Sequence, residues 1–237
     1  MDYSKKKRDE LIAICKEKKI NGYSKKTKDE IIKLIIAPIA PIEKEKRIKN
    51  TKKENREDSY TKELLIEQYA LHKSYVIGRK KTTKKTGVTV RLPSIPEDIS
   101  ENIIKQIIHN KLGDKSSSWD CKTGDLQSKK EGKQECKCFT SNGPPSFTPS
   151  SDWDVIYFLD ARKWLEDKFI LFQIPLKRTS TEWKNIKVNK NQTFDDQTKQ
   201  KRRPRITWKS LEPQLRAHCN KVYEGTFDDI FIPLDSM

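Results

Sequence analysis

The clearest pattern of apolar and polar positions in the chain lies between residues 94 and 112. Five isoleucines from Ile99 to Ile108 recur at helical spacing, Pro96 and two acids precede them, and Gly113 follows. Apolar residues three or four apart lie on one face of a helix, whereas proline and acids favour its first turn and glycine its end. We therefore predict a helix over residues 94–112.

Three shorter segments predict strands. Residues 135–139 alternate between charged side chains and cysteines, whereas residues 155–159 and 169–174 are apolar runs. Alternation is typical of a strand with two different faces, and a short run of apolar β-branched and aromatic residues is typical of a strand that is buried on both faces. We predict that the two apolar runs are neighbouring strands of a buried sheet.

Weaker patterns complete the predicted order of elements. A helix resumes over residues 61–72, and residues 75–77 and 88–92 have the composition of short strands around a basic turn. The chain then continues with a basic loop over residues 177–205 and a helix over about residues 211–223. A helix, several consecutive strands and a final helix favour an α/β (α+β) fold, with a mixed β-sheet flanked by helices.

Residues 4–36 have the pattern of two short amphipathic helices separated by a turn. Leu11 and Cys15 are spaced for one helix face, and Thr27, three residues before Glu30, forms a capping-box pattern ahead of the second helix. The polar side is rich in lysine and includes Lys5, Lys6, Lys7, Lys25, Lys26 and Lys28. Such a segment is too small to be an enzyme and is typical of an adaptor. A solvated helical hairpin is the alternative.

Three pieces of this segment resemble a SAP domain, which is a two-helix DNA-binding module. The pieces are residues 9–12, 18–24 and 28–35, and the second contains the bend at Asn21-Gly22. The resemblance implies contact with the minor groove or the backbone of DNA, with little sequence preference, and Lys25 and Lys26 are its candidate contacts.

The next segment predicts a tether. Prolines at positions 38 and 41 block a helix, and the almost wholly charged run after them cannot bury enough apolar surface to fold alone. The predicted organisation is therefore a SAP-like domain over residues 1–36, a charged linker over residues 37–60 and a larger domain over residues 61–237.

Positive charge is in large excess. The chain carries 50 Lys and Arg residues against 34 Asp and Glu residues, a net charge of +16, which favours a polyanionic partner over an acidic small molecule. No stretch reaches the roughly 18–20 consecutive apolar residues of a membrane span, and no apolar signal region follows the first residues. We expect a soluble cytoplasmic or intracellular protein, associated with nucleoid or viral DNA and not secreted.

The cysteines indicate reduced thiols. They are Cys15, Cys121, Cys136, Cys138 and Cys219, an odd number without the even framework of a small secreted domain. A zinc site from Cys121, Cys136, Cys138 and the His218-Cys219 pair is an alternative, but the absence of a C-x2-C spacing disfavours it.

Residues 125–138 carry the candidate chemistry. The period of two in a strand places Glu135 and Lys137 on one face and the two cysteines on the other. Asp125 lies beside Glu135 if the two segments form a hairpin. Hydrolysis of a phosphodiester needs a hard divalent cation held by oxygen ligands, and a group that helps a water molecule to lose its proton. Two carboxylates and a lysine supply both requirements.

Gly124-Asp125-Leu126 and Glu135-Cys136-Lys137 resemble the two halves of the motif that names the PD-(D/E)XK nuclease superfamily, with glycine in place of proline. The wider stretch over residues 91–231 resembles the type II restriction endonucleases of that superfamily. The matching pieces are residues 96–102, 131–139, 153–162 and 178–183.

This resemblance implies a role for each motif residue. Asp125 and Glu135 would bind Mg²⁺, for which Mn²⁺ can substitute, and the carbonyl of Cys136 would be a third ligand. Lys137 would polarise the attacking water or neutralise charge on phosphorus. Glu101 matches an acid that many members place on the preceding helix, where it binds a metal ion through water.

Alternatives to this site remain open. Asp114, Asp120, Asp152 and Asp154 are competing carboxylates, and Asp120 is the main rival to Asp125 because Trp119 could anchor it. Glu135 and Lys137 could also form no more than an exposed ion pair, which contributes under about 1 kcal/mol to stability.

Two basic segments are candidate DNA contacts. Residues 177–185 mix Arg, hydroxyl groups and Asn, which can bind base edges as well as phosphates, and residues 199–205 are dense enough in positive charge for a phosphate clamp. The candidates are Lys177, Arg178, Thr179, Ser180, Thr181, Lys184, Asn185, Lys199, Lys201, Arg202, Arg203 and Arg205. A solvated basic loop is the alternative for the second segment. Trp153, Trp164 and Trp208 are predicted to be core residues rather than stacking platforms.

The resemblance implies a type II site-specific deoxyribonuclease that cleaves double-stranded DNA by metal-activated water attack and leaves 5′-phosphate ends. It also implies a homodimer and a companion DNA methyltransferase that acts on the same site. The alternatives are a non-specific viral or repair nuclease and a catalytically inactive DNA-binding protein.

Overall fold

The computed structural model describes residues 3, 6–17, 23, 26–36, 60–119 and 125–234. The chain divides into two compact units, Met1–Glu54 and Asn55–Met237. The predicted linker over residues 37–60 lies outside the described residues, apart from Tyr60. The boundaries that we predicted for the domains therefore stay predictions.

The described residues of the first unit form the helices α1 (Arg8–Glu17) and α2 (Lys28–Ile36). Leu11 and Cys15 of α1 and Ile31 of α2 are fully buried in their contact. The backbone N–H of Thr27 donates to the Glu30 carboxylate at 2.8 Å, so one half of the predicted capping box is present. The predicted pair of amphipathic helices is confirmed.

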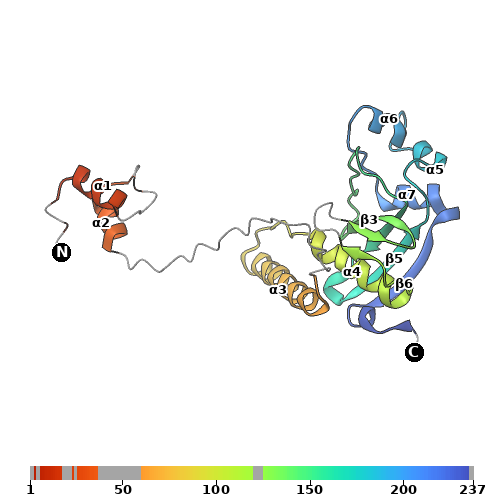
Figure 1. Ribbon diagram of the computed structural model, residues 1–237, viewed down its shortest axis with the longest axis horizontal. Helices are drawn as coiled ribbons and strands as arrows, with labels where there is room; N and C mark the ends of the chain where they lie inside the picture. Colours follow the sequence, from red (N-terminus) through yellow and green to blue (C-terminus); the bar gives the residue numbers. More distant parts are fainter. Residues whose placement is uncertain are drawn as a thin grey trace. The chain divides into compact units, whose positions relative to one another are not determined.

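A six-stranded mixed sheet forms the centre of the second unit (Figure 1), in the order β1-β2-β3-β4-β5-β6. The strands are β1 (Ser118–Trp119), β2 (Leu126–Ser128), β3 (Gly132–Phe139), β4 (Val155–Asp160), β5 (Lys168–Ile174) and β6 (Asn220–Thr226). Only β3 and β4 pair in parallel, and the other neighbours pair antiparallel. The strands β3, β4 and β5 confirm the three predicted strands, and β4 and β5 are neighbours as expected.

Each face of the sheet buries its own hydrophobic cluster. On one face, the helices α3 (Lys62–Thr86) and α4 (Glu97–Lys111) cover Cys136, Tyr157 and Leu171. On the other face, Ile156 and Phe158 pack with residues of α5 (Thr181–Asn185), α6 (Phe194–Lys199) and α7 (Trp208–Leu215). The predicted fold class, a mixed sheet flanked by helices, is confirmed.

Helix α4 confirms the helix predicted from the isoleucines. Ile99, Ile103, Ile104, Ile107 and Ile108 are all buried. The chain leaves the helix through Gly113, whose φ of 70° lies in the left-handed region that favours glycine. This helix lies against the strand that carries the candidate chemistry, because α4 contacts β3.

The prediction of two short strands, over residues 75–77 and 88–92, is wrong. Helix α3 begins after Thr61, as predicted, but it continues to Thr86, and no strand follows over residues 88–92. Leu65, Tyr69 and Val76 recur at helical spacing on its buried face, so packing against the body outweighs the β propensity of the short apolar run. No helix in the described part of the chain is long and apolar enough to cross a membrane.

The predicted helix over residues 211–223 is also wrong in its second half. Helix α7 ends at Leu215, and after a 3-10 turn (Arg216–His218) the chain forms β6, which pairs with β5 at the edge of the sheet. The free edge of β5 offers backbone hydrogen bonds to this segment, and the local spacing of apolar residues does not reveal such a distant partner. The predicted basic loop over residues 177–205 contains α5 and α6.

Candidate active site

The β2–β3 hairpin brings Asp125 and Glu135 together. Leu126 pairs with Gln134 in this antiparallel ladder, so the next position places Asp125 opposite Glu135. The backbone N–H of Cys136 donates to Asp125 Oδ1 at 3.3 Å. The hairpin that the sequence left conditional is therefore present, and it places two carboxylates side by side.

Strand alternation separates the charged residues of β3 from its thiols, as predicted. Lys137 Nζ lies 2.6 Å from Glu135 Oε1 and 5.9 Å from the centre of the Phe147 ring, which belongs to the cluster on the α7 side. Cys136 and Cys138 face the opposite cluster, under α4. The Glu135 side chain is only 4% exposed, so the alternative of an exposed ion pair does not hold.

The electrostatics of the site are those of two acids that compete for one cation. Burial raises the pKa of Asp125 to about 8, and the hydrogen bond and the repulsion from Glu135 act in the same direction. Burial alone would lower the pKa of Lys137, but the nearby carboxylates outweigh it and raise this pKa. The ammonium therefore stays charged, and it cannot fully neutralise both acids.

Glu101 reaches the same site from α4. Its side chain accepts a hydrogen bond of 2.7 Å from the indole N–H of Trp119 on β1. Burial raises the pKa of Glu101 to about 7, against the opposing effect of that hydrogen bond and of Lys137. Charge interactions link Glu101 to both Asp125 and Lys137. The structure thus brings all four predicted catalytic residues into one cluster.

A cleft of about 630 Å³ opens beside the acid pair. Asp125 and Glu135 line it together with Lys133, and residues 148–152 contribute Thr148, Ser150, Ser151 and Asp152 on the other side. Sequence reasoning did not single out these hydroxyl residues. Their only signal was a loop rich in Ser, Pro and Gly between two strands, which is typical of many surface loops.

The donor set fits a hard divalent cation better than zinc. Asp125 and Glu135 are adjacent, buried carboxylates, and the single ammonium of Lys137 cannot neutralise the charge of both. Oxygen ligands of this kind are those that Mg²⁺ prefers. In the ranges described, no cluster of three or more His, Cys, Asp or Glu side chains has the geometry of an ion site. Further ligands would have to come from backbone carbonyls and water.

The competing acids are occupied by other partners. Asp114, in the turn before β1, accepts hydrogen bonds from the hydroxyl groups of Ser116 and of Ser128 on β2. Asp152 pairs with Lys133 at 2.6 Å, and Asp154 accepts from the Lys133 N–H at 3.0 Å. Asp120 and Cys121 lie outside the described residues, so the choice between Asp120 and Asp125 rests on the geometry of Asp125 alone.

Most of the predicted DNA contacts are exposed. They belong to the segment that contains α5 and α6 (Figure 1). The exposed candidates are Lys177, Thr179, Thr181, Lys184, Asn185, Lys199, Lys201, Arg202, Arg203 and Arg205. Ser180 instead caps α5 by accepting from the Trp183 N–H. In the first unit, Lys26 lies 3.8 Å from Glu30, and Lys25 is outside the description.

Arg178 points into the protein rather than outward. Its guanidinium donates to the Pro149 carbonyl at 3.1 Å and to the Thr198 hydroxyl at 3.2 Å, and it lies over the rings of Trp153 and Phe194. Burial lowers its pKa. Arg178 therefore ties α6 to the loop that forms one side of the cleft. Trp153 and Trp164 are buried and Trp208 is partly buried, which confirms their predicted role as core residues.

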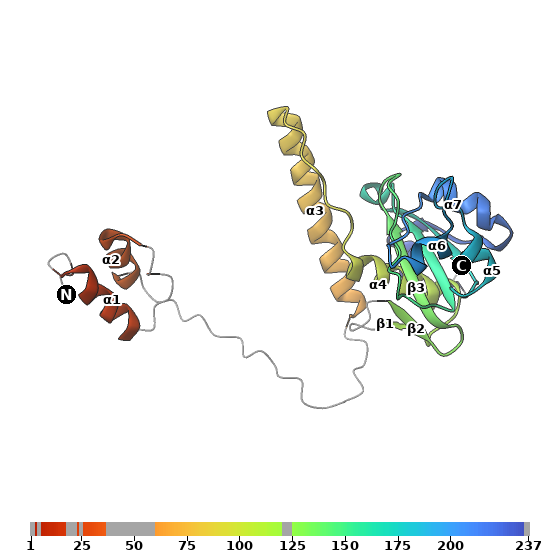
Figure 2. The ribbon, with the colours of Figure 1, turned by 90° about the horizontal axis from the view of Figure 1, so that it is seen from above.

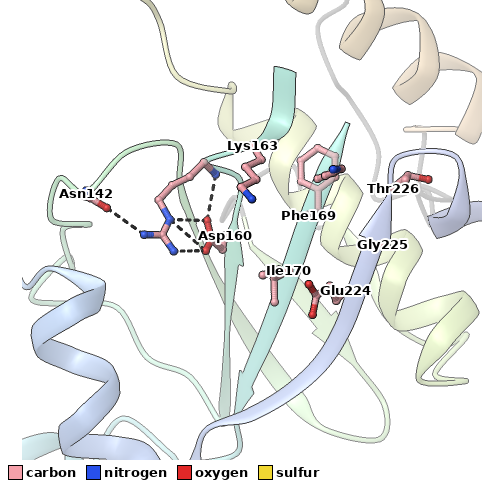
Figure 3. Close-up of a pocket in the computed structure, with 10 residues that line it drawn as sticks. Asn142, Asp160, Lys163, Phe169, Ile170, Glu224, Gly225 and Thr226 are labelled. Carbon is pink, nitrogen blue, oxygen red and sulfur yellow. Dashed lines mark hydrogen bonds and ion pairs between the residues drawn. The ribbon is translucent and has the colours of Figure 1, made fainter. Parts of the chain in front are cut away.

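A larger hollow of about 840 Å³ lies over the other end of β4, β5 and β6 (Figure 3). Its two acids already have partners. Asp160 pairs with Arg162 at 2.6 Å, Arg162 also donates to Asn142, and Glu224 pairs with Lys221. The adjacent, incompletely neutralised carboxylates found at Asp125 and Glu135 are therefore missing from this hollow.

Comparisons with known proteins identify the family of the chain. The family model of the Bsp6I restriction endonuclease matches residues 65–211, which contain Asp125, Glu135 and Lys137. The type II restriction enzyme Bsp6I of Bacillus sp. (strain RFL6) is 32% identical over 117 residues, which are 48% of this chain and 62% of that enzyme. The chain thus matches less than two thirds of the relative's length. No solved structure matches the chain. Because the family model covers more than half of it, the chain belongs to the Bsp6I restriction endonuclease family.

Proposed function

We propose that the chain is a metal-dependent type II endonuclease that cleaves double-stranded DNA at specific sites and leaves 5′-phosphate and 3′-hydroxyl ends. The observation that carries this proposal is the hairpin pairing that sets Asp125 opposite Glu135, with the Lys137 ammonium 2.6 Å from Glu135. Membership of a restriction endonuclease family supports the same activity.

Asp125 and Glu135 would hold Mg²⁺ or Mn²⁺, with the Cys136 carbonyl as a third ligand. When bound, a divalent cation supplies positive charge that polarises a phosphodiester and offsets the charge that develops on phosphorus. The hydrogen bond from the Cys136 N–H holds the Asp125 carboxylate against β3. This bond would hold the Asp125 carboxylate beside the two ligands that β3 provides.

Lys137 and Glu101 have separate roles in this proposal. The Lys137 ammonium, which the surrounding acids keep protonated, orients the attacking water and stabilises negative charge on the phosphate. Glu101, whose pKa of about 7 lies near neutrality, accepts a proton from that water or binds the ion through a second water.

The duplex would lie across the cleft beside Asp125. The exposed lysine and arginine side chains of residues 177–185 and 199–205 would contact the phosphates and base edges of this duplex. A homodimer would present two such clefts to the two strands of a palindromic site. A companion methyltransferase that acts on the same sequence would protect the DNA of the cell, and the SAP-like segment would tether the enzyme to DNA.

Plasmid digestion with the full chain in Mg²⁺ tests the activity. Discrete fragments support a site-specific enzyme, whereas a smear supports a non-specific viral or repair nuclease. Asp125→Asn, Glu135→Gln and Lys137→Met should each abolish cleavage while they preserve DNA binding in Ca²⁺.

A second Lys–Glu ion pair in the chain offers a matched control. Lys221 and Glu224 form an exposed ion pair with the same 2.6 Å separation, far from the cleft. Lys221→Met and Glu224→Gln should leave cleavage unchanged. Unchanged cleavage in all three active-site variants would overturn the proposal, and binding without any cleavage by the parent chain would favour the inactive DNA-binding protein.

A further inference from the structure

The outer part of α3 extends beyond the body of the second unit. Figure 2 shows the helix rising away from the sheet, with its carboxyl-terminal end farthest from β1 and β2. Val76 is the last residue of α3 that is buried in the core. We define the arm as residues 77–94, which comprise the rest of α3 and the segment that returns to α4.

The arm carries positive charge without compensation. No acid occurs between Glu67 and Glu97. Lys80, Lys81, Lys84, Lys85 and Arg91 are all exposed. In the described part of the chain, none of them takes part in an ion pair. A surface lysine usually has acids nearby, so this stretch differs from the mixed charge of an ordinary soluble helix.

The spacing of the lysines concentrates the charge on one side of the helix. Lys80 and Lys84 are four residues apart, as are Lys81 and Lys85, so each pair of ammonium groups lies side by side. Like charges at this spacing destabilise a helix, and a polyanion that binds along it removes the repulsion. The ten helical residues of the arm span about 15 Å, which matches roughly four phosphates along one strand of a duplex.

The arm is fixed to the body at both ends. On α3, Tyr69 donates to the Trp164 carbonyl at 2.7 Å and Lys73 pairs with Asp167. At the other end, the Thr140 hydroxyl donates to the Ser94 hydroxyl at 3.3 Å. Thr140 directly follows β3, three residues after Lys137, so the arm leaves the body about 10 Å along the strand from the candidate active site.

We propose that the arm binds the phosphate backbone of duplex DNA outside the cleft, and so extends the contact of the enzyme beyond the bases at which it cuts. This inference rests on the proposed function. Contacts to phosphates carry no sequence information, so the arm adds affinity and a faster encounter with DNA rather than sequence preference.

The test is the salt dependence of DNA binding by the full chain in Ca²⁺, with a 40-base-pair duplex of random sequence as the probe. The variant K80Q/K81Q/K84Q/K85Q removes four charges and keeps good helix formers. Because each neutralised phosphate contributes about 0.9 to the slope of log affinity against log salt, the slope should become shallower by up to about 3.6. Plasmid cleavage by this variant should give the same fragments more slowly at high salt.

The matched control removes the same charge elsewhere. Lys115, Lys163, Lys168 and Lys221 are exposed on the body outside the proposed DNA contacts, and K115Q/K163Q/K168Q/K221Q should leave the slope within about 1 of the parent value. An unchanged slope in the arm variant, or an equal loss in the control, would overturn the inference. Weaker binding of the arm variant to a single-stranded RNA of 40 nucleotides, with unchanged binding to the duplex, would also overturn it. If the parent chain neither binds nor cuts duplex DNA, the proposed function itself fails, which is a different result.

Discussion

The backbone N–H of Cys136 donates to Asp125 Oδ1 across 3.3 Å, and so joins the residue before β2 to the middle of β3. Cys136 lies between Glu135 and Lys137 in β3, and its thiol is buried under α4. One residue thus fixes the first acid with its backbone, and anchors the strand of the second acid with its side chain. The geometry of the candidate site depends on the hairpin more than on any single rotamer.

The turn of this hairpin gives the first prediction. Gly132 has a φ of 76°, and a Cβ atom there would collide with the Asp154 carboxylate, which the Lys133 N–H holds in place. Gly132→Ala should lower the free energy of unfolding by about 1–3 kcal/mol, measured by urea denaturation. It should also slow cleavage. Gly143→Ala, at a glycine of ordinary φ, is the control, and equal stability of the two variants would contradict this prediction.

The raised pKa of Asp125 predicts how the stability of the metal-free protein depends on pH. Between its ordinary value of 3.8 and about 8, the unfolded chain releases this proton while the folded chain keeps it. The free energy of unfolding therefore falls as pH rises through this window. Thermal unfolding in EDTA should show a decline in the Tm of the parent chain relative to Asp125→Asn from pH 5 to pH 8. Parallel Tm curves would contradict it.

Trp119 predicts a shift in the pH profile of cleavage. Its indole N–H lowers the pKa of Glu101 against the larger effect of burial. Trp119→Phe removes this donor, so the pKa should rise and the ascending limb of the rate profile should move up by about one pH unit. Trp208→Phe, in the cluster on the other face of the sheet, should leave the limb in place. A profile that Trp119→Phe does not move would remove Glu101 from the mechanism.

The base of α3 predicts a stability effect without a change in chemistry. The Tyr69 hydroxyl donates to the Trp164 carbonyl and also lies 2.8 Å from Asp167. Tyr69→Phe should cost about 1.5 kcal/mol in the free energy of unfolding, because a buried carbonyl loses its donor. The exposed Tyr75 offers the matched control, since Tyr75→Phe should be neutral. Equal unfolding midpoints in urea would show that this contact does not anchor the helix.

The proposed role of the first unit as a tether predicts that its deletion changes DNA binding but not the sites of cleavage. Deletion of residues 1–58 should weaken DNA binding and flatten its salt dependence, because lysines of the first unit no longer contact phosphates. The set of plasmid fragments should stay the same. If the shortened chain prefers a new cutting site, the first unit reads sequence, and its description as a SAP-like tether is wrong.

The sequence alone predicted the parts of the site that depend on local periodicity. The alternation of Glu135 and Lys137 with two cysteines required only that this segment be a strand, and the isoleucines of α4 required only helical spacing. Both patterns act between residues a few positions apart. The same reasoning failed at residues 75–77, where a short apolar run suits a strand or a buried helix equally well.

The tertiary structure decided what depends on contacts between distant residues. Only the pairing of β2 with β3 sets Asp125 opposite Glu135, and only the packing of α4 and β1 brings Glu101 and Trp119 to them. The edge of β5 turned the last predicted helix into β6. The chain thus encodes which side chains can perform the chemistry in its local pattern. Their convergence depends on burial and strand pairing, whose free energy comes from residues far apart in the sequence.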